Sequence, residues 1–245
     1  MHPFAVRNSD SSSTGEISSL EKTRIRELYL ASAYPVAGRS PRLFATAGNI
    51  AAGKTSLLRF LSAAGKLPAA HAVRHDPDAV MSEISAYRED TLLQPEAAFR
   101  RWEIPARVLA DEILVTAVQR RCDVVYDRTC ALPDTVRMLQ NLKHQEKYGI
   151  TMYFVWASLS ECLQRSKRRA VTSRRHVPED VITERAQSLR ELVPAYIELA
   201  DEVLIYENHD GTGPRHIGSL RGNKRSEVHD DACLTQFAQE YRLKI

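Results

Sequence analysis

Hydrophobic positions follow two alternating patterns along most of the chain. Continuous apolar runs of strand length predict buried strands at residues 42–47, 72–75, 123–127, 151–156 and 202–206. Helical patterns lie between and around these runs, over about 20–34, 54–64, 95–121, 133–148, 157–200 and 230–243. The range 157–200 contains a basic loop that separates two helices. Strands that alternate with helices are typical of a mainly parallel sheet covered on both faces. We therefore expect an α/β fold with a five-stranded sheet.

Neither an internal repeat nor a clear linker follows residue 20. We expect residues 20–245 to form one domain, with an N-terminal helix at 20–34, a core over about 40–210 and a C-terminal helix at about 230–243. Residues 1–19 are rich in Ser and Thr and poor in large apolar residues, which predicts a disordered tail. A secretion or partner-binding segment is the alternative interpretation of this tail.

Composition and charge narrow the class of protein. With 43% hydrophobic residues and a net charge of +3, the chain resembles an ordinary globular protein and gives no reason to expect nucleic acid as a partner. Its four cysteines form no CxxC pair, which predicts reduced thiols in a cytosolic protein. No apolar run approaches the roughly 18 residues of a membrane helix, and the N-terminus lacks the apolar core of a signal peptide. We expect a cytoplasmic protein that does not enter the membrane, with a secreted effector as the alternative.

The clearest motif is a phosphate-binding loop between the first strand and the helix that follows it. Residues Gly48-Asn49-Ile50-Ala51-Ala52-Gly53-Lys54-Thr55 match G-x-x-x-x-G-K-[ST], and the predicted nucleotide contacts extend to Ser56. The glycines allow backbone N–H groups to turn toward a phosphate, and the N-terminus of the helix adds its positive dipole. Lys54 is expected to reach the terminal phosphates and Thr55 to ligate Mg²⁺. The alternative is an ordinary helix start with an incidental lysine.

Two absent motifs limit which P-loop class the chain can represent. The sequence has no N-K-x-D segment, which weakens the GTPase interpretation, and no LSGGQ-like segment, which weakens the ABC interpretation. A P-loop alone does not separate these classes from motors and small-molecule kinases, so the later motifs must decide.

Carboxylates follow the second and third predicted strands. Asp76 and Asp78 end one strand, and Asp127 ends the other, so all three are expected at the sheet edge where ligands gather. A carboxylate there can take the proton of an attacking hydroxyl, and Asp78 is the favoured candidate. Asp127 is a candidate Mg²⁺ ligand or substrate contact. The alternatives are helix caps and capped turns, and for Asp111, inside a helix, a solvated helix face.

Basic residues crowd the segment after the fourth predicted strand. They are Arg165, Lys167, Arg168, Arg169, Arg174 and Arg175. A lid of arginines can neutralise the charge that develops on a transferred phosphoryl group. A nucleic-acid patch or a merely solvated face is the alternative.

The order of these motifs resembles the zeta-toxin-like P-loop kinases over roughly residues 40–210. The resemblance rests on the P-loop, the D-x-D of Asp76 and Asp78, the acidic strand end at Asp127, the arginine helix and the R-x-V-P segment at 175–178. It implies a P-loop kinase fold with an Arg-rich lid, an acceptor such as the 3′-hydroxyl of UDP-N-acetylglucosamine and a small helical antitoxin as partner.

The same resemblance assigns roles to individual residues. Lys54 and Thr55 take the phosphate and Mg²⁺ roles, and Asp78 matches the catalytic base. The γ-phosphate arginines match Arg175 and one of Arg165 and Arg169, with Arg169 favoured for catalysis and Arg165 for nucleotide binding. Substrate contacts match Asp111 and Thr129, with Asp76 and Asp127 nearby.

This chain departs from the family pattern on the acceptor side. Cys130 and Ala131 replace the Gly-Arg pair of the toxins, and the His-Pro that usually follows D-x-D is absent after Asp78. Ala51 also stands where related kinases often carry glycine. The resemblance therefore supports ATP as the phosphate donor more strongly than it supports a sugar nucleotide as the acceptor. NAD or an antibiotic as acceptor, and a nucleotide-dependent binding or switch protein without turnover, are the alternatives.

Overall fold

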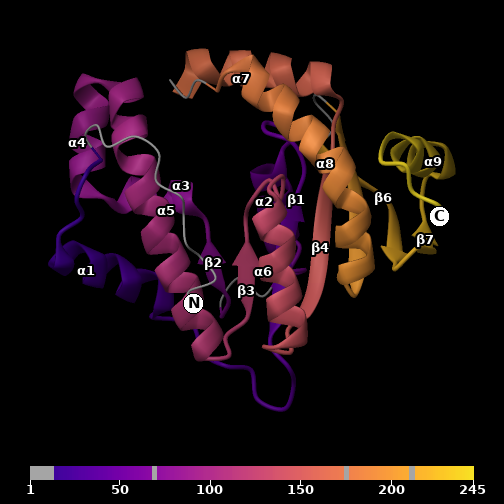
Figure 1. The fold of residues 1–245 in the computed structure, drawn as a ribbon, viewed down its shortest axis with the longest axis horizontal. Coiled ribbons are helices and arrows are strands. Elements are labelled where there is room, and N and C mark those ends of the chain that lie inside the picture. Colours follow the sequence, from indigo (N-terminus) through magenta and orange to yellow (C-terminus); the bar gives the residue numbers. More distant parts are fainter. Residues whose placement is uncertain (1–13, 68–70, 174–176, 210–212) are drawn as a thin grey trace.

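The computed structural model describes residues 14–67, 71–173, 177–209 and 213–245. Its strands form one sheet in the order β2-β3-β1-β4-β5-β6-β7 (Figure 1). The strands are β1 (Arg42–Ala47), β2 (Val73–His75), β3 (Val124–Tyr126), β4 (Gly149–Trp156), β5 (Glu202–His209), β6 (Gly213–Arg221) and β7 (Lys224–Val228). The helices are α1 (Ser19–Leu30), α2 (Lys54–Ala63), α3 (Pro77–Glu83), α4 (Ser85–Leu93), α5 (Pro95–Gln119), α6 (Pro133–His144), α7 (Leu159–Ser173), α8 (Glu179–Leu199) and α9 (Asp231–Glu240).

The five predicted strands are present and mutually parallel, but the prediction of five strands in all was wrong. The sheet has seven, because β6 and β7 add an antiparallel extension beyond β5. Every described side chain of β7 is exposed, and β6 contains two glycines and a proline. Neither β6 nor β7 therefore shows the continuous apolar pattern of a buried strand. Each is a strand because its backbone pairs with the preceding strand, β6 with β5 and β7 with β6. The predicted helix over 20–34 ends earlier, at Leu30.

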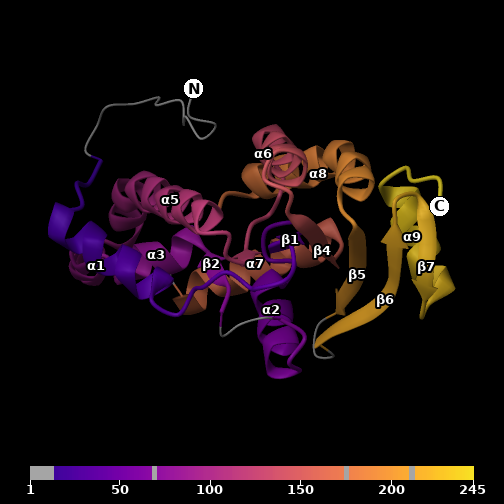
Figure 2. The same ribbon diagram turned by 90° about the horizontal axis from the view of Figure 1, so that it is seen from below.

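The sheet separates two hydrophobic cores. In β1, Leu43, Ala45 and Ala47 face one core, while Phe44 faces the other. Helix α2 lies on one face of the sheet, and α5, α6 and α8 cover the opposite face (Figure 2). Because side chains alternate along a strand, the five parallel strands can bury both faces, which explains their continuous apolar runs.

Packing begins before the first helix. Ile17 is buried in the larger core, and the Gly15 N–H donates a hydrogen bond to the Arg101 carbonyl of α5. Ser18 then caps α1 by accepting from the Glu21 N–H. The segment from residue 14 onward is thus part of the packed structure, and residues 1–13 of the predicted tail lie outside the described residues.

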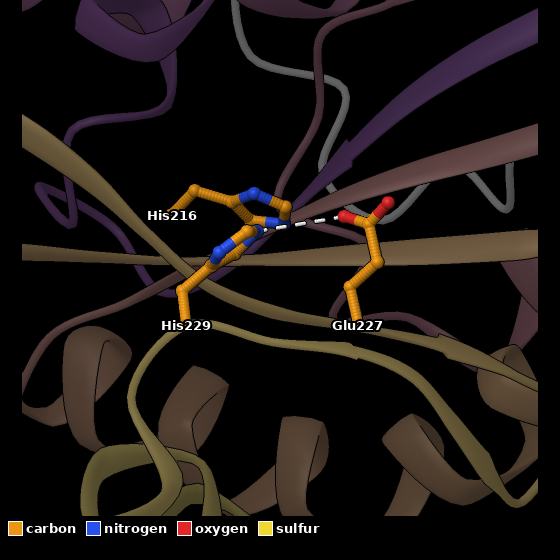
Figure 3. Close-up of side chains that lie close together, drawn as sticks. All are labelled: His216, Glu227 and His229. Atoms are coloured by element: carbon orange, nitrogen blue, oxygen red, sulfur yellow. Dashed lines mark ion pairs between the residues drawn. The ribbon is translucent and has the colours of Figure 1, made fainter.

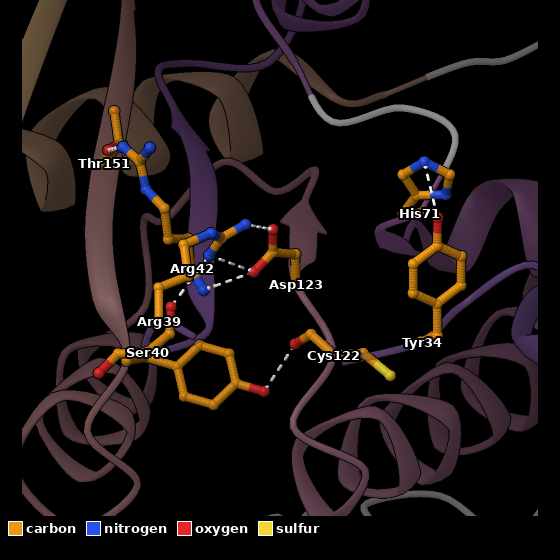
Figure 4. A network of polar contacts seen from close by, with 9 residues as sticks. Tyr34, Arg39, Ser40, Arg42, His71, Cys122, Asp123 and Thr151 are labelled. Carbon is orange, nitrogen blue, oxygen red and sulfur yellow. Dashed lines mark hydrogen bonds and ion pairs between the residues drawn. The ribbon is translucent and has the colours of Figure 1, made fainter. Parts of the chain in front are cut away.

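A buried carboxylate fastens the amino end of the sheet. Asp123, which is 1% exposed, accepts hydrogen bonds from the Arg42 N–H at 2.8 Å and from Arg39 Nη1 at 3.0 Å (Figure 4). Arg42 also donates to Thr151 of β4. These bonds join the starts of β1, β3 and β4 at the edge opposite the P-loop, so this network is structural.

Within the described ranges, no helix combines the length and the apolar character needed to cross a bilayer.

We expect Phe237→Ala to destabilise the fold, because this ring anchors α9 to the sheet. Phe237 is fully buried, and its ring contacts those of Phe154 and Trp156 at centroid distances of 5.1 and 6.1 Å. We expect the substitution to lower the free energy of unfolding, measured by urea titration, by about 3–5 kcal/mol. Val171→Ala, at a position that is 84% exposed, is the control and should change it by less than about 0.5 kcal/mol. Equal effects of the two substitutions would contradict this packing.

Candidate functional site

The sheet reverses its strand order beside β1. From β1 the chain goes to β2 and β3 on one side and later to β4 and β5 on the other. Open α/β sheets bind ligands at such a switch point, outside the carboxyl ends of the strands. The loop Gly48–Gly53 lies at this point, between β1 and α2, and α7 crosses the same edge of the sheet (Figure 1).

Neighbouring strands press against both glycines of the loop. Gly48 has φ +136°, and a Cβ there would lie 2.4 Å from the Val155 carbonyl oxygen of β4. Gly53 has φ +106°, and its Cβ would lie 2.0 Å from Nδ2 of Asn208 in β5. Ala51 adopts the left-handed conformation with φ +61°, which costs an alanine more than a glycine. The motif glycines are therefore required by sterics as well as by backbone conformation.

Lys54 holds its ammonium inside the loop. Nζ donates to the carbonyl oxygens of Gly48 at 3.1 Å and Asn49 at 2.8 Å. Burial of this cation lowers the pKa of Lys54 to about 8, and the neighbouring Asp127 carboxylate offsets only part of that effect. A partly buried cation held by two neutral carbonyls is a ready site for an anion, because an anionic ligand would supply negative charge in place of the lost hydration. Thr55 and Ser56, at the start of α2, are exposed.

Arg165 and Asn208 close the outer side of the loop. Arg165 of α7 donates to the Asn208 carbonyl at 2.6 Å and to the Ala52 carbonyl at 3.3 Å, and Asn208 Nδ2 also donates to Ala52 at 2.8 Å. One helical turn further on, Arg169 lies close enough to lower the pKa of Lys54. The predicted arginine helix therefore reaches the phosphate loop. Arg174 and Arg175 lie outside the described residues.

The acids predicted at the strand ends meet on the same edge. Arg74 bridges Asp76 at 3.0 Å and Asp127 at 2.9 Å. Asp127 also accepts a hydrogen bond from Thr46 at the end of β1. Burial raises the pKa of Asp76, and the neighbouring Asp127 and Asp78 carboxylates raise it further. The three acids thus share one region, and Asp127 connects it to Lys54.

The structure separates the roles of the two acids in D-x-D. Asp76 is the N-cap of α3, because its side chain accepts from the Ala79 N–H. Asp78 lies in the first turn of the same helix and is half-buried. The capping function is therefore fulfilled by Asp76 and not by Asp78.

His75 pairs with Asp111, a contact that the sequence analysis did not predict. His75 is buried, stacks on Tyr126 and lies with Nε2 2.9 Å from Oδ1 of Asp111 in α5. Its other ring nitrogen, Nδ1, has no hydrogen-bond partner among the described residues. Asp111 is thus held at the site edge and is not on a solvated helix face. His75 adjoins the D-x-D motif, but its partner lies 36 residues away, so no local pattern predicts this contact.

The segment after β3 supports the loop through its backbone. The Thr129 carbonyl accepts from the Gly48 N–H at 3.1 Å, and Cys130 Sγ lies 3.0 Å from the Thr46 carbonyl. Cys130 has φ +54°, and its carbonyl accepts from the Tyr196 hydroxyl. Cys130 and Ala131 are both buried, so neither side chain reaches toward a substrate. Thr129 is adjacent to the loop and half-buried.

A strand-loop-helix phosphate cradle at the switch point of a parallel sheet, crossed by an arginine helix, defines a P-loop kinase fold. Comparison with known proteins agrees, since the family profile described as Zeta toxin matches residues 27–213. The chain belongs to the zeta toxin family. Comparison with curated protein sequences gives no match.

Two solved structures show the same fold at low sequence identity. The toxin–antitoxin system PezAT of Streptococcus pneumoniae aligns with a TM-score of 0.60 at 13% identity, covering 93% of each chain. The AvrRxo1-ORF1:-ORF2 complex with ATP aligns with a TM-score of 0.65 at 19% identity, covering 92% of this chain and 71% of that chain.

We expect Gly53→Ala to weaken ATP binding by about tenfold or more, because the new methyl group must displace Asn208 from a backbone already in a left-handed conformation. Gly65→Ala is the matched control, since Gly65 also has a positive φ of +65° but has open space around its Cβ position. Isothermal titration calorimetry measures the ATP affinity of the two variants and of the unsubstituted protein. Equal affinities would show that crowding at Gly53 does not shape the cradle.

The lowered pKa of Lys54 predicts proton uptake when ATP binds. With a pKa of about 8, the ammonium is half deprotonated at pH 8 in the free protein, and a bound polyphosphate raises this pKa again. Affinity should therefore be highest below pH 8 and fall as pH rises through that value, with uptake of about half a proton at pH 8. Calorimetry in buffers of different ionisation enthalpy measures this uptake. It should disappear in Lys54→Met and persist in Lys147→Met, and proton release on binding would contradict the assignment.

Proposed function

We propose that this protein is an ATP- and Mg²⁺-dependent kinase that transfers the γ-phosphate to a hydroxyl group of a small molecule. One observation carries the proposal. The Lys54 cradle and the acids Asp76, Asp78 and Asp127 lie on one edge of the sheet, joined by Arg74 and by the influence of Asp127 on Lys54. A phosphate site beside a set of candidate bases is the arrangement that phosphoryl transfer to a hydroxyl requires.

The reaction needs one base and several positive charges. Asp78 takes the proton of the acceptor hydroxyl, whose oxygen forms a bond to the γ-phosphorus while the bond to the β-phosphate oxygen breaks and ADP leaves. Lys54 and Arg165 hold the phosphates, and Arg169 with Arg175 neutralises the charge on the transferred group. Asp111, held by His75, and Thr129 contact the acceptor.

The residues present fit a magnesium nucleotide. The loop has glycines with positive φ at both ends, which lets its backbone N–H groups turn toward a phosphate. Thr55 is exposed at the helix start and Asp127 lies beside Lys54, and these two would hold Mg²⁺ directly or through water. The ion would neutralise phosphate charge. The AvrRxo1 structure with ATP, which has the same fold, supports nucleotide use.

UDP-N-acetylglucosamine is the first acceptor to test, because the chain belongs to the zeta toxin family. The segment at Cys130 and Ala131 is buried and carries no charge toward the site, unlike the Gly-Arg pair described above. This difference supports testing NAD and hydroxyl-bearing antibiotics beside the sugar nucleotide.

A small helical antitoxin is the proposed protein partner. The support is that both similar structures were solved from two-component systems, PezAT and the AvrRxo1-ORF1:-ORF2 complex.

We expect Asp78→Asn to abolish phosphate transfer and leave ATP affinity nearly unchanged, because the amide cannot accept the hydroxyl proton. The assay is ADP release with ATP and Mg²⁺, with and without UDP-N-acetylglucosamine, NAD or an antibiotic. A loss of about a hundredfold or more is expected. Asp134→Asn is the matched control, because Asp134 lies in the first turn of α6 and its side chain is 77% exposed.

Equal turnover of Asp78→Asn and the unsubstituted protein would remove Asp78 from the mechanism. ATP binding without acceptor-dependent ADP release, across all three acceptor types, would instead favour a nucleotide-dependent binding protein.

A further inference from the structure

Two histidines and a glutamate converge on the edge hairpin of the sheet. His216 belongs to β6, Glu227 to β7, and His229 follows β7 directly (Figure 3). One ligand atom from each residue lies within 4.8 Å of the ligand atoms of the other two. Glu227 and His229 are two residues apart on one extended segment, so their side chains share a face of the hairpin.

The spacing of these atoms matches a metal coordination shell. His229 Nε2 lies 3.5 Å from Glu227 Oε2. Zinc binds imidazole nitrogen and carboxylate oxygen at about 2.0–2.2 Å in a tetrahedron, which puts neighbouring donors about 3.4 Å apart. Small rotations of exposed side chains would bring all three donors to that spacing, and a fourth position would remain for water.

The surrounding structure holds the first ligand in place. The His216 ring stacks on Tyr206 of β5, and its centroid lies 4.6 Å from that of His229. Its Nε2 lies 3.0 Å from Ser219 Oγ and 3.1 Å from the Gly218 carbonyl oxygen. An ion at Nε2 would take the place of the proton that this nitrogen shares with those oxygens. The His229 N–H donates to the Ile217 carbonyl at 3.0 Å, which places the second histidine opposite the first.

The three side chains also offer the donor types that a divalent transition-metal ion prefers. A neutral imidazole offers a lone pair, and the Glu227 carboxylate supplies the negative charge that attracts a cation.

We propose that His216, Glu227 and His229 form a binding site for a divalent transition-metal ion, with Zn²⁺ as the best match to the donor set. The ion would tie β7 to β6. The described side chains of β7 are all exposed, so the strand contributes no buried side chain of its own to the core. A bond across the hairpin would therefore secure the edge strand and the start of α9, which follows it.

The test is Zn²⁺ titration of the full chain after chelator treatment, with excess Mg²⁺ present to occupy the nucleotide site. Calorimetry gives the stoichiometry and affinity, and the visible absorption of bound Co²⁺ reports the coordination geometry. We expect one ion per chain. Glu227→Gln and His229→Ala each remove one ligand at an exposed position, and each should weaken binding by at least about tenfold.

Two variants at exposed positions serve as controls. Glu191→Gln on α8 and His144→Ala on α6 make the same chemical changes outside the proposed site. Both control variants should bind Zn²⁺ with the affinity of the unsubstituted protein. Absence of ion uptake by the unsubstituted protein would overturn the proposal. Equal affinity in all four variants would also overturn it, because the ion would then bind elsewhere. The folded state of each variant is checked by circular dichroism.

Discussion

The close approach of β4 and β5 to the loop after β1 is the constraint on which the site depends. Val155 and Asn208 leave no space for a side chain at Gly48 and Gly53, so the loop backbone is pressed into the conformation of a phosphate cradle. Arg165 then contacts both the loop and β5, which couples the lid helix to the cradle. The order of the strands therefore determines the geometry of the loop, because β4 and β5 lie on the side of β1 away from β2 and β3.

Charge is arranged around this loop before any ligand binds. Two carbonyl oxygens and the nearby Asp127 stabilise the charged form of Lys54. Loss of hydration destabilises that charged form, which is why the pKa is lowered. Arg74 neutralises part of the repulsion between Asp76 and Asp127. Because cation and acids occupy neighbouring positions on one edge, a phosphate donor and a hydroxyl acceptor could bind side by side.

The two ends of the parallel strands serve different purposes. At the amino end, Asp123 accepts hydrogen bonds from Arg39 and Arg42, and Arg42 in turn donates to Thr151 of β4. At the carboxyl end, Lys54 lies in the loop after β1, and Arg74 joins Asp76 to Asp127 after β2 and β3. The antiparallel hairpin of β6 and β7 belongs to neither end. Its cluster of imidazole and carboxylate groups lies beside Tyr206, which belongs to the same hydrophobic core as Ala52 of the nucleotide loop.

The sequence by itself determined the parallel part of the fold and the position of the cradle. The apolar runs of β1 to β5 mark strands because both of their faces are buried, and the Gly48–Thr55 motif is local, so its residues need no distant partner to be recognised. Tertiary structure alone decided the extension to seven strands, since Lys224–Val228 is polar except for Val228, is exposed along its length, and becomes a strand only by pairing with β6. It also decided that Asp111 meets His75 and that Glu227 and His229 meet His216. Such contacts depend on the distance between residues in space, and a pattern read along one chain carries no information about that distance.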